Sequence, residues 1–112
     1  MKKAVAIYTD GACEGNPGPG GFAAVIDSDG SRREITGGVK RTTNNRMELI
    51  AAIKGLESLP AHSSAILTSD SSYLVNTMTA GWKRKINHDL WASLDTLNAN
   101  LSIQWEWVKG HS

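Results

Sequence analysis

The stretch Thr42-Thr43-Asn44-Asn45-Arg46-Met47-Glu48-Leu49 is the point at which the hydrophobic spacing of the chain changes. Upstream of it, short apolar runs alternate with segments rich in Gly and Pro, which is typical of strands and turns. Downstream of it, apolar residues recur at three- and four-residue spacing, as in an amphipathic helix that Thr43 or Asn44 would cap and Pro60 would end. This change of period predicts strands followed by helix, and hence a mixed α/β fold.

The expected order of elements is three strands, a helix, a strand, two helices and a last strand. The strands are expected at residues 4–9, 22–27, 32–39, 65–68 and 102–108, and the two later helices at 73–78 and 89–99. A Gly- and Pro-rich loop at residues 15–21 and an Asp29-Gly30 turn would join the first three strands as an antiparallel meander. The strand–helix–strand order that follows would add parallel strands, so the expected fold class is α/β, a mixed sheet with helices packed on it.

Length, charge and cysteine content limit the classes of function. The 112 residues fit a single domain, residues 1–112, and the net charge of +1 is far from the basic balance of proteins that hold nucleic acid mainly by charge. Cys13 is the only cysteine, which excludes an intramolecular disulfide and a CxxC zinc or redox site and favours the cytoplasm. The apolar run near the start is too short for a signal peptide or a membrane span, so we expect no membrane partner. We also expect no organic cofactor.

Three acidic residues are expected to converge. Asp10 and Asp70 each follow an expected strand, and Glu48 lies in the first turns of the helix between them. Carboxylates brought close together repel one another unless a divalent cation lies among them, and a cluster of oxygen ligands favours Mg²⁺ or its substitute Mn²⁺. Such cations serve phosphoryl transfer, so a nuclease or phosphatase is indicated. Taken singly, the two aspartates also fit turn formers, and Glu48 fits a helix-capping residue on the surface.

Five motifs resemble bacterial-type (type 1) ribonuclease H, in order and at similar spacing. They are Tyr8-Thr9-Asp10-Gly11, the loop at 15–21, the run from Thr42 to Leu49, Ser69-Asp70-Ser71, and Trp105-Glu106-Trp107-Val108-Lys109-Gly110-His111. The resemblance implies the ribonuclease H fold and a metal-dependent endonuclease that cuts the RNA strand of an RNA·DNA hybrid by a two-metal mechanism. It also implies that Asp10, Glu48 and Asp70 are three of the four metal-binding carboxylates of the family.

The resemblance further assigns residues to the substrate and to the proton chemistry. It places Asn16, Asn44 and Asn45 against the backbone and bases of the hybrid, Thr43 and Asn87 in a pocket for a DNA phosphate, Gly11, Cys13 and Ser72 against RNA 2′-hydroxyls, and Trp82 against DNA. His111 resembles a loop histidine that is proposed to help release product or shuttle a proton. Simple helix capping is the alternative for Asn44, and core packing is expected for the other tryptophans.

Two departures from the family pattern affect the expected activity. Only Gly81-Trp82-Lys83-Arg84-Lys85 stands where better-known relatives carry a longer basic protrusion, so a weaker grip on the hybrid is expected. The chain stops at Ser112, before the family's C-terminal helix and its fourth aspartate, so weak or conditional activity is expected. A truncated chain, a natural short form, and a chain whose missing helix comes from a second copy or another fragment all fit this pattern. The chain is expected to be a monomer unless another chain supplies the helix.

Two other functions compete with the nuclease. One is a module that binds the hybrid with little or no turnover, or an inactive fragment. The other is a different nuclease of the wider fold, such as an exonuclease or integrase relative, which shares the acidic cluster. The run from Thr42 to Leu49 argues against the second alternative, because it resembles ribonuclease H specifically.

Overall fold

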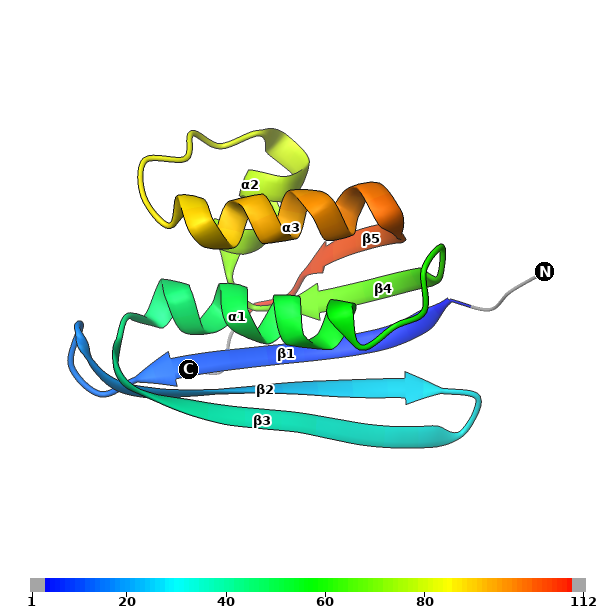
Figure 1. Ribbon diagram of the computed structural model, residues 1–112, viewed down its shortest axis with the longest axis horizontal. Coiled ribbons are helices and arrows are strands. Elements are labelled where there is room, and N and C mark those ends of the chain that lie inside the picture. Colours follow the sequence, from blue (N-terminus) through cyan, green and yellow to red (C-terminus); the bar gives the residue numbers. More distant parts are fainter. Residues whose placement is uncertain (1–3, 110–112) are drawn as a thin grey trace.

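Five strands form one mixed sheet, and three helices lie on one side of it in the computed structural model, which describes residues 4–109 (Figure 1). The elements in chain order are β1 (Val5–Cys13), β2 (Gly18–Ser28), β3 (Ser31–Thr42), α1 (Asn44–Glu57), β4 (Ser64–Ser69), α2 (Ser72–Ala80), α3 (His88–Asn100) and β5 (Ser102–Trp107). The strand order across the sheet is β3-β2-β1-β4-β5. The β1–β2 and β2–β3 pairs are antiparallel, and the β1–β4 and β4–β5 pairs are parallel, which confirms the predicted fold class.

Local chemistry explains where the first elements begin and end. Asp29 and Gly30 have φ angles of 51° and 80°, as the tight turn between β2 and β3 requires. Thr43 caps α1, because its side chain accepts a hydrogen bond of 3.2 Å from the backbone N–H of Arg46. Helix α1 ends at Glu57, before Pro60, so the expected cap and stop are both confirmed.

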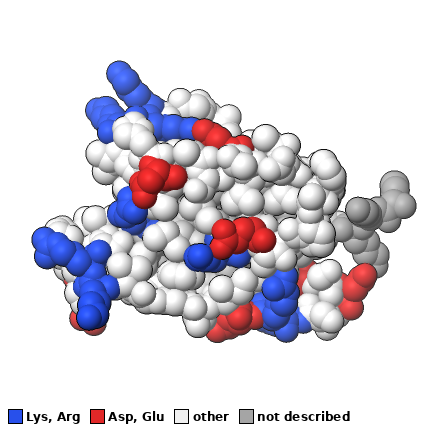
Figure 2. Space-filling model, viewed as in Figure 1, with Lys and Arg blue, Asp and Glu red and all other residues white. Residues whose placement is uncertain are grey.

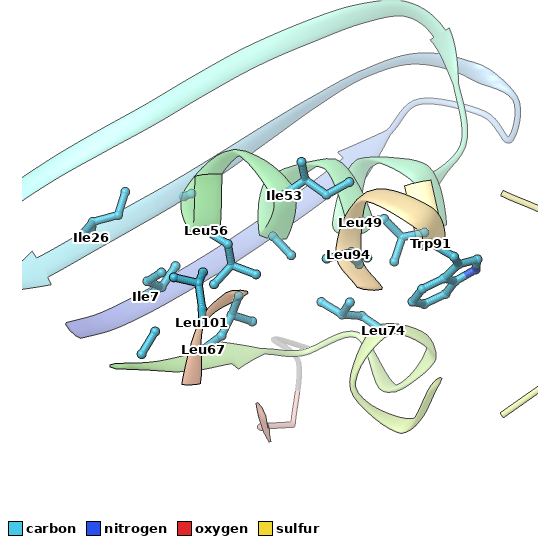
Figure 3. Packing of buried hydrophobic residues seen from close by; sticks show 13 residues of the cluster. Ile7, Ile26, Leu49, Ile53, Leu56, Leu67, Leu74, Trp91, Leu94 and Leu101 are labelled. Carbon is cyan, nitrogen blue, oxygen red and sulfur yellow. The ribbon is translucent and has the colours of Figure 1, made fainter. Parts of the chain in front are cut away.

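The core lies between the sheet and the helices (Figure 3). Ile7 of β1 and Leu67 of β4 are fully buried under Leu49 and Leu56 of α1. Gly55 allows α1 to approach the sheet, because a Cβ atom there would lie 3.1 Å from Cγ2 of Ile7. Helix α1 is therefore held at a fixed height over β1, which in turn fixes the position of Glu48 relative to the strand ends.

The strands are longer than the sequence predicts. Strand β1 was expected to stop at Asp10-Gly11, but it continues to Cys13, because residues 10–13 pair with residues 20–23 of β2. Strand β2 accordingly starts at Gly18, inside the expected loop, and only residues 14–17 connect the two strands. Pairing across the sheet has therefore overridden the local turn signals of Gly and Pro.

The later elements agree with the prediction to within a few residues. Helices α2 and α3 enclose the predicted ranges 73–78 and 89–99, and β4 and β5 match the two predicted late strands. Within residues 4–109 no helix follows α3. None of the helices in this described part of the chain is long and apolar enough to cross a membrane.

Candidate metal and nucleic-acid site

The three predicted carboxylates meet at one edge of the sheet. The parallel register pairs Thr9 of β1 with Ser69 of β4, so the next residue on each strand is an aspartate, Asp10 and Asp70. Helix α1 brings Glu48 beside them, and one carboxylate oxygen of each residue lies within 4.8 Å of the others. Although Asp10 lies inside β1 rather than after it, the expected convergence of the three acids is correct.

Close contact between β1 and α1 sets this spacing. A Cβ atom on Gly11 would lie 2.5 Å from the backbone carbon of Met47 and 2.6 Å from the backbone nitrogen of Glu48. No side chain fits in that gap without moving the helix. Gly11 also donates a backbone hydrogen bond to the Glu48 carboxylate, so the residue that the resemblance assigned to RNA contact has a structural role as well.

The charge on Glu48 is poorly compensated within the protein. Burial raises the pKa of Glu48 from 4.5 to about 8, and a hydrogen bond to Asp70 and the negative charges of Asp70 and Asp10 act in the same direction. Only 8% of Glu48 is exposed, and its Oε1 atom is buried without a hydrogen-bond partner in the described part of the chain. A buried carboxylate oxygen that lacks a partner indicates that a positively charged ligand belongs beside it.

A divalent cation fits the residues that are present. The cluster offers oxygen ligands alone, with neither imidazole nor thiolate among its three members. Hard cations such as Mg²⁺ and Mn²⁺ prefer this ligand set, whereas zinc sites usually contain His or Cys. The unpaired Oε1 atom and the oxygen-only ligand set therefore point to the same class of ion.

Hydrogen bonds hold the turn that carries Asp70. The side chain of Ser69 accepts from the backbone N–H of Ser71 at 3.0 Å, and the side chain of Ser71 caps α2 by accepting from Leu74 at 3.1 Å. Trp107 of β5 donates its indole N–H to the Asp70 carbonyl at 3.1 Å. Because 52% of Trp107 is exposed, the prediction that it packs in the core is wrong, and its role is to hold this turn.

An open cleft of about 320 Å³ adjoins the carboxylates. Its lining consists of Gly11, Ala12, Asn44, Asn45, Glu48, Asp70, Ser71, Ser72 and Tyr73. Four of the predicted substrate residues thus share one wall with two of the acids. A larger hollow of about 440 Å³ beside the β1–β2 connection contains Cys13 but none of the three carboxylates, so the smaller cleft is the better candidate for the reaction.

Asn44 ties the β1–β2 connection to the start of α1. Its Oδ1 atom accepts from the backbone N–H of Cys13 at 2.7 Å, and its own backbone N–H donates to Oδ1 of Asn16 at 3.1 Å. The Cys13 thiol donates to the carbonyl of Gly15 at 2.7 Å. The structure therefore groups three predicted substrate residues, Cys13, Asn16 and Asn44, next to the cleft.

The remaining predicted residues lie apart from the acids or outside the described chain. Asn87 adjoins the start of α1, where its Oδ1 atom accepts from Arg46 at 3.1 Å. Trp82 lies on the connection between α2 and α3 and is 49% exposed, away from the cleft lining. His111 lies outside residues 4–109, so nothing is described of it.

Three residues of the site were not found from the sequence. Arg46 links Thr43, the cap of α1, to Asn87, Tyr73 lines the cleft, and Trp107 holds the Asp70 turn. Each role depends on contacts between distant parts of the chain. All three stand inside or beside the quoted motifs, and that position is the one signal that would have pointed to them.

The profile of the RNase H family matches residues 2–112. The chain belongs to this family. Ribonuclease H of Aeromonas salmonicida is 49% identical over 125 aligned residues, which cover 100% of this chain and 81% of the relative. Ribonuclease H of Trichodesmium erythraeum is 45% identical and covers 96% of this chain and 78% of the relative. The chain is accordingly an enzyme of the RNase H family.

Solved structures agree with this assignment. The N-terminal RNase H domain of Rv2228c from Mycobacterium tuberculosis has a TM-score of 0.87 and 32% identity, with 96% of this chain and 88% of that chain covered. LC11-RNase H1 in complex with an RNA/DNA hybrid has a TM-score of 0.76 and 27% identity, with 92% and 85% covered. The alignment with the Aeromonas enzyme spans more positions than this chain has residues, so RNase H of that organism carries inserted residues that this chain lacks.

Proposed function

We propose that this RNase H hydrolyses the RNA strand of RNA·DNA hybrids with divalent cations held by Asp10, Glu48 and Asp70. The observation that carries the proposal is the meeting of these three carboxylates within 4.8 Å, with one buried Glu48 oxygen left unpaired. The relatives named ribonuclease H and the neighbour solved with an RNA/DNA hybrid support the choice of substrate.

The residues of the chain have separate tasks in this reaction. Asp10, Glu48 and Asp70 would hold Mg²⁺ or Mn²⁺, which would supply an activated water and stabilise charge on the leaving oxygen, as in other two-metal phosphoryl-transfer sites. Asp10 presents its carboxylate from β1, Asp70 from the residue that follows the adjacent strand β4, and Glu48 from α1. Gly11 keeps strand and helix at the required separation. We assign a product-release or proton-shuttle role to His111, which lies outside the described residues.

Small and polar groups around the cleft suit recognition of RNA. Gly11 and Ser72 lie in the cleft wall and Cys13 lies beside it, so a ribose can approach the backbone closely there. A 2′-hydroxyl is both donor and acceptor, and it is the group by which a protein distinguishes RNA from DNA. Asn16, Asn44 and Asn45 are proposed to contact the hybrid nearby.

The DNA strand is proposed to bind beside the start of α1, toward the α2–α3 connection. Thr43 and Asn87 are bridged by Arg46, which places the two residues of the proposed phosphate pocket near one another. Trp82 and the basic α2–α3 connection lie at the end of the molecule where Figure 2 shows basic side chains gathered. Because this connection is short, affinity for the hybrid should be lower than in a relative with a longer basic segment.

Turnover is proposed to be weak or dependent on conditions. Within residues 4–109, the acidic cluster has three members. Asp89 and Asp95 cannot extend it, because each is paired with an arginine, at 2.9 Å to Arg46 and at 2.6 Å to Arg84. A protein that binds the hybrid without cutting it is therefore the second candidate.

Cleavage of a labelled RNA·DNA hybrid tests the proposal. The assay uses Mg²⁺ and Mn²⁺ in separate arms, with single-stranded RNA, duplex RNA and duplex DNA as other substrates. Cutting of the hybrid alone, lost in Asp10→Asn but kept in Asp95→Asn, is the expected result. Binding of the hybrid without cutting in either metal would replace the enzyme by the binding module.

We also propose that the enzyme is a monomer that acts in the cytoplasm. The single cysteine remains the basis for the compartment. Sedimentation at several protein concentrations tests the oligomeric state, and an activity that rises more than linearly with enzyme concentration would instead indicate that a second copy completes the site.

A further inference from the structure

A chain of hydrogen bonds runs from the start of α3 to a tyrosine in the wall of the cleft. Asp89 accepts two hydrogen bonds from Arg46, of 3.2 and 2.9 Å. Arg46 also donates to Oδ1 of Asn87 at 3.1 Å, and Nδ2 of Asn87 donates to the Tyr73 hydroxyl at 3.2 Å. The indole N–H of Trp91 donates to the same hydroxyl at 3.3 Å.

Donor and acceptor chemistry fixes the direction of each bond. A guanidinium group has donors only, so Asn87 must turn its oxygen to Arg46 and its amide nitrogen to Tyr73. An indole has one donor and no acceptor, so the oxygen of Tyr73 accepts from Trp91 as well. Both acceptor positions of the phenol are then in use, and its proton must point to a third group. Within residues 4–109 the Tyr73 hydroxyl donates to no acceptor.

The position of Tyr73 brings this donor to the reaction site. Tyr73 lines the cleft of about 320 Å³ together with Glu48 and Asp70. Its ring packs edge-on against Trp91, with centroids 5.3 Å apart and an interplanar angle of 64°. The two accepted hydrogen bonds and this ring contact hold in place the hydroxyl of a residue that lines the cleft.

The Asn87 side chain takes part in this series of hydrogen bonds instead of capping α3. It is the N-cap residue of α3, yet its side chain makes no capping hydrogen bond, although Asn is among the residues that most often cap helices in this way. Its backbone adopts the left-handed conformation, with φ 62° and ψ 32°, which non-glycine residues adopt at a cost. The carboxamide is instead held at both ends, by Arg46 and by Tyr73.

We propose that Tyr73 is a substrate-binding residue whose hydroxyl donates a hydrogen bond to an oxygen of the nucleic-acid backbone, and that Asn87 and Arg46 are the positioning residues that aim it. The proposal rests on the proposed function, since the cleft must take nucleic acid. A phosphate oxygen and a ribose 2′-hydroxyl share the required acceptor chemistry.

Steady-state cleavage by Tyr73→Phe tests the contact. The variant keeps the ring and removes the hydroxyl, which is the proposed donor to the substrate and also the acceptor for Asn87 and Trp91. KM for the hybrid should rise about tenfold while kcat stays unchanged, as for a lost hydrogen bond to a charged oxygen. Thr79→Val is the matched control, because it removes a hydroxyl from the same helix that bonds only to the Val75 carbonyl, at 2.7 Å. An unchanged KM in Tyr73→Phe, with any loss confined to thermal stability, would overturn the proposal.

A second variant tests whether Asn87 positions Tyr73. Asn87→Gly tolerates the left-handed backbone and removes the carboxamide that donates to the Tyr73 hydroxyl. Because the hydroxyl is then no longer aimed, Tyr73→Phe should raise KM less in the Asn87→Gly background than in the unmodified protein. An equal rise in both backgrounds would show that Asn87 does not position Tyr73.

Binding measurements identify the acceptor and separate this proposal from the proposed function. A phosphate partner predicts that Tyr73→Phe weakens binding of the hybrid and of duplex DNA equally, whereas a 2′-hydroxyl partner predicts weaker binding of the hybrid alone. Equal affinities of the variant and the unmodified protein for both duplexes would overturn the contact. Failure of the unmodified protein to cut the hybrid refutes the proposed function but leaves this binding test intact.

Discussion

Replacing Glu48 by glutamine should make the metal-free protein more stable at pH 8. Glutamine has nearly the same shape as glutamate but carries no charge, so it removes the ionised carboxylate from a position that is only 8% exposed. The substitution also removes one ligand of the proposed cation site. The two effects oppose each other when metal is present, and that opposition makes the prediction testable.

The magnitude follows from the pKa of Glu48, which burial and the neighbouring aspartates raise from 4.5 to about 8. Below pH 4.5 the group is protonated in both the folded and the unfolded chain, and no penalty arises. Between pH 4.5 and 8 the folded state binds more protons, so the free energy of unfolding falls as the pH rises, by about 1.4 kcal/mol per unit. The full penalty at pH 8 is up to about 5 kcal/mol, and Glu48→Gln should recover most of it.

Urea unfolding at pH 4.5 and pH 8, with a chelator and with added Mg²⁺, measures these effects. With the chelator, Glu48→Gln should unfold at a higher urea concentration than the unmodified chain at pH 8 and at a similar one at pH 4.5. With Mg²⁺, the unmodified chain should gain stability, because an ion that binds only the folded state raises the free energy of unfolding. The variant should gain little, because it lacks one ligand of the proposed site. Glu57→Gln is the control on the same helix, where the exposed pair with Lys54 is worth well under about 1 kcal/mol.

If the free energy of unfolding changes with pH in the same way for Glu48→Gln and the unmodified chain in the chelator, the electrostatic reasoning is refuted. That result would mean that the Glu48 carboxylate has a compensating partner in solution. Equal stabilisation of both proteins by Mg²⁺ would instead refute the assignment of Glu48 as a ligand, while leaving the effect of burial intact.

Other substitutions test the supporting structure. Gly11→Ala should destabilise the fold by about 3 kcal/mol and abolish cleavage, because the added Cβ overlaps the backbone of α1; urea unfolding and the hybrid assay check both, and an active, stable variant would contradict the close packing. Thr43→Ala should cost about 1 kcal/mol by loss of the α1 cap, measured as a shift in the urea midpoint. Lys83→Ala with Lys85→Ala should make the salt dependence of hybrid binding shallower without changing the melting temperature. Arg84→Ala should lower the melting temperature, because Arg84 pairs with Asp95 and stacks on the Trp91 ring. If Arg84→Ala instead makes the salt dependence shallower and the two lysine substitutions do not, the stacked arginine is the residue that binds nucleic acid.

The sequence predicts those parts of the fold that local chemistry decides. The Asp29-Gly30 turn and the Thr43 cap were predicted, because turn and cap preferences act within a few residues. The length of β1 was not predicted, since Asp10 and Gly11 read locally as a turn while the ladder to β2 keeps them extended. The strand limits were therefore set by partners that the local sequence does not reveal.

The same distinction applies to the site. Asp10, Glu48 and Asp70 were found because their residue type and their motifs carry the signal. Arg46 and Tyr73 were not, because their function arises from contacts across the fold, such as the Arg46 hydrogen bond to a residue 41 positions away. A charged or aromatic side chain in a sequence does not show which partner it will meet.

Pairing inside the fold also changes what the charge of the sequence means for binding. The run Lys83-Arg84-Lys85 reads as three positive charges, but Arg84 is bound to Asp95 by hydrogen bonds of 2.6 and 2.9 Å and lies 5.1 Å from the centre of the Trp91 ring. Arg84 therefore shapes the connection, and the two exposed lysines are left to meet phosphate. Since each neutralised phosphate contributes about 0.9 to the slope of log affinity against log salt, this connection should add about 2 to that slope rather than 3.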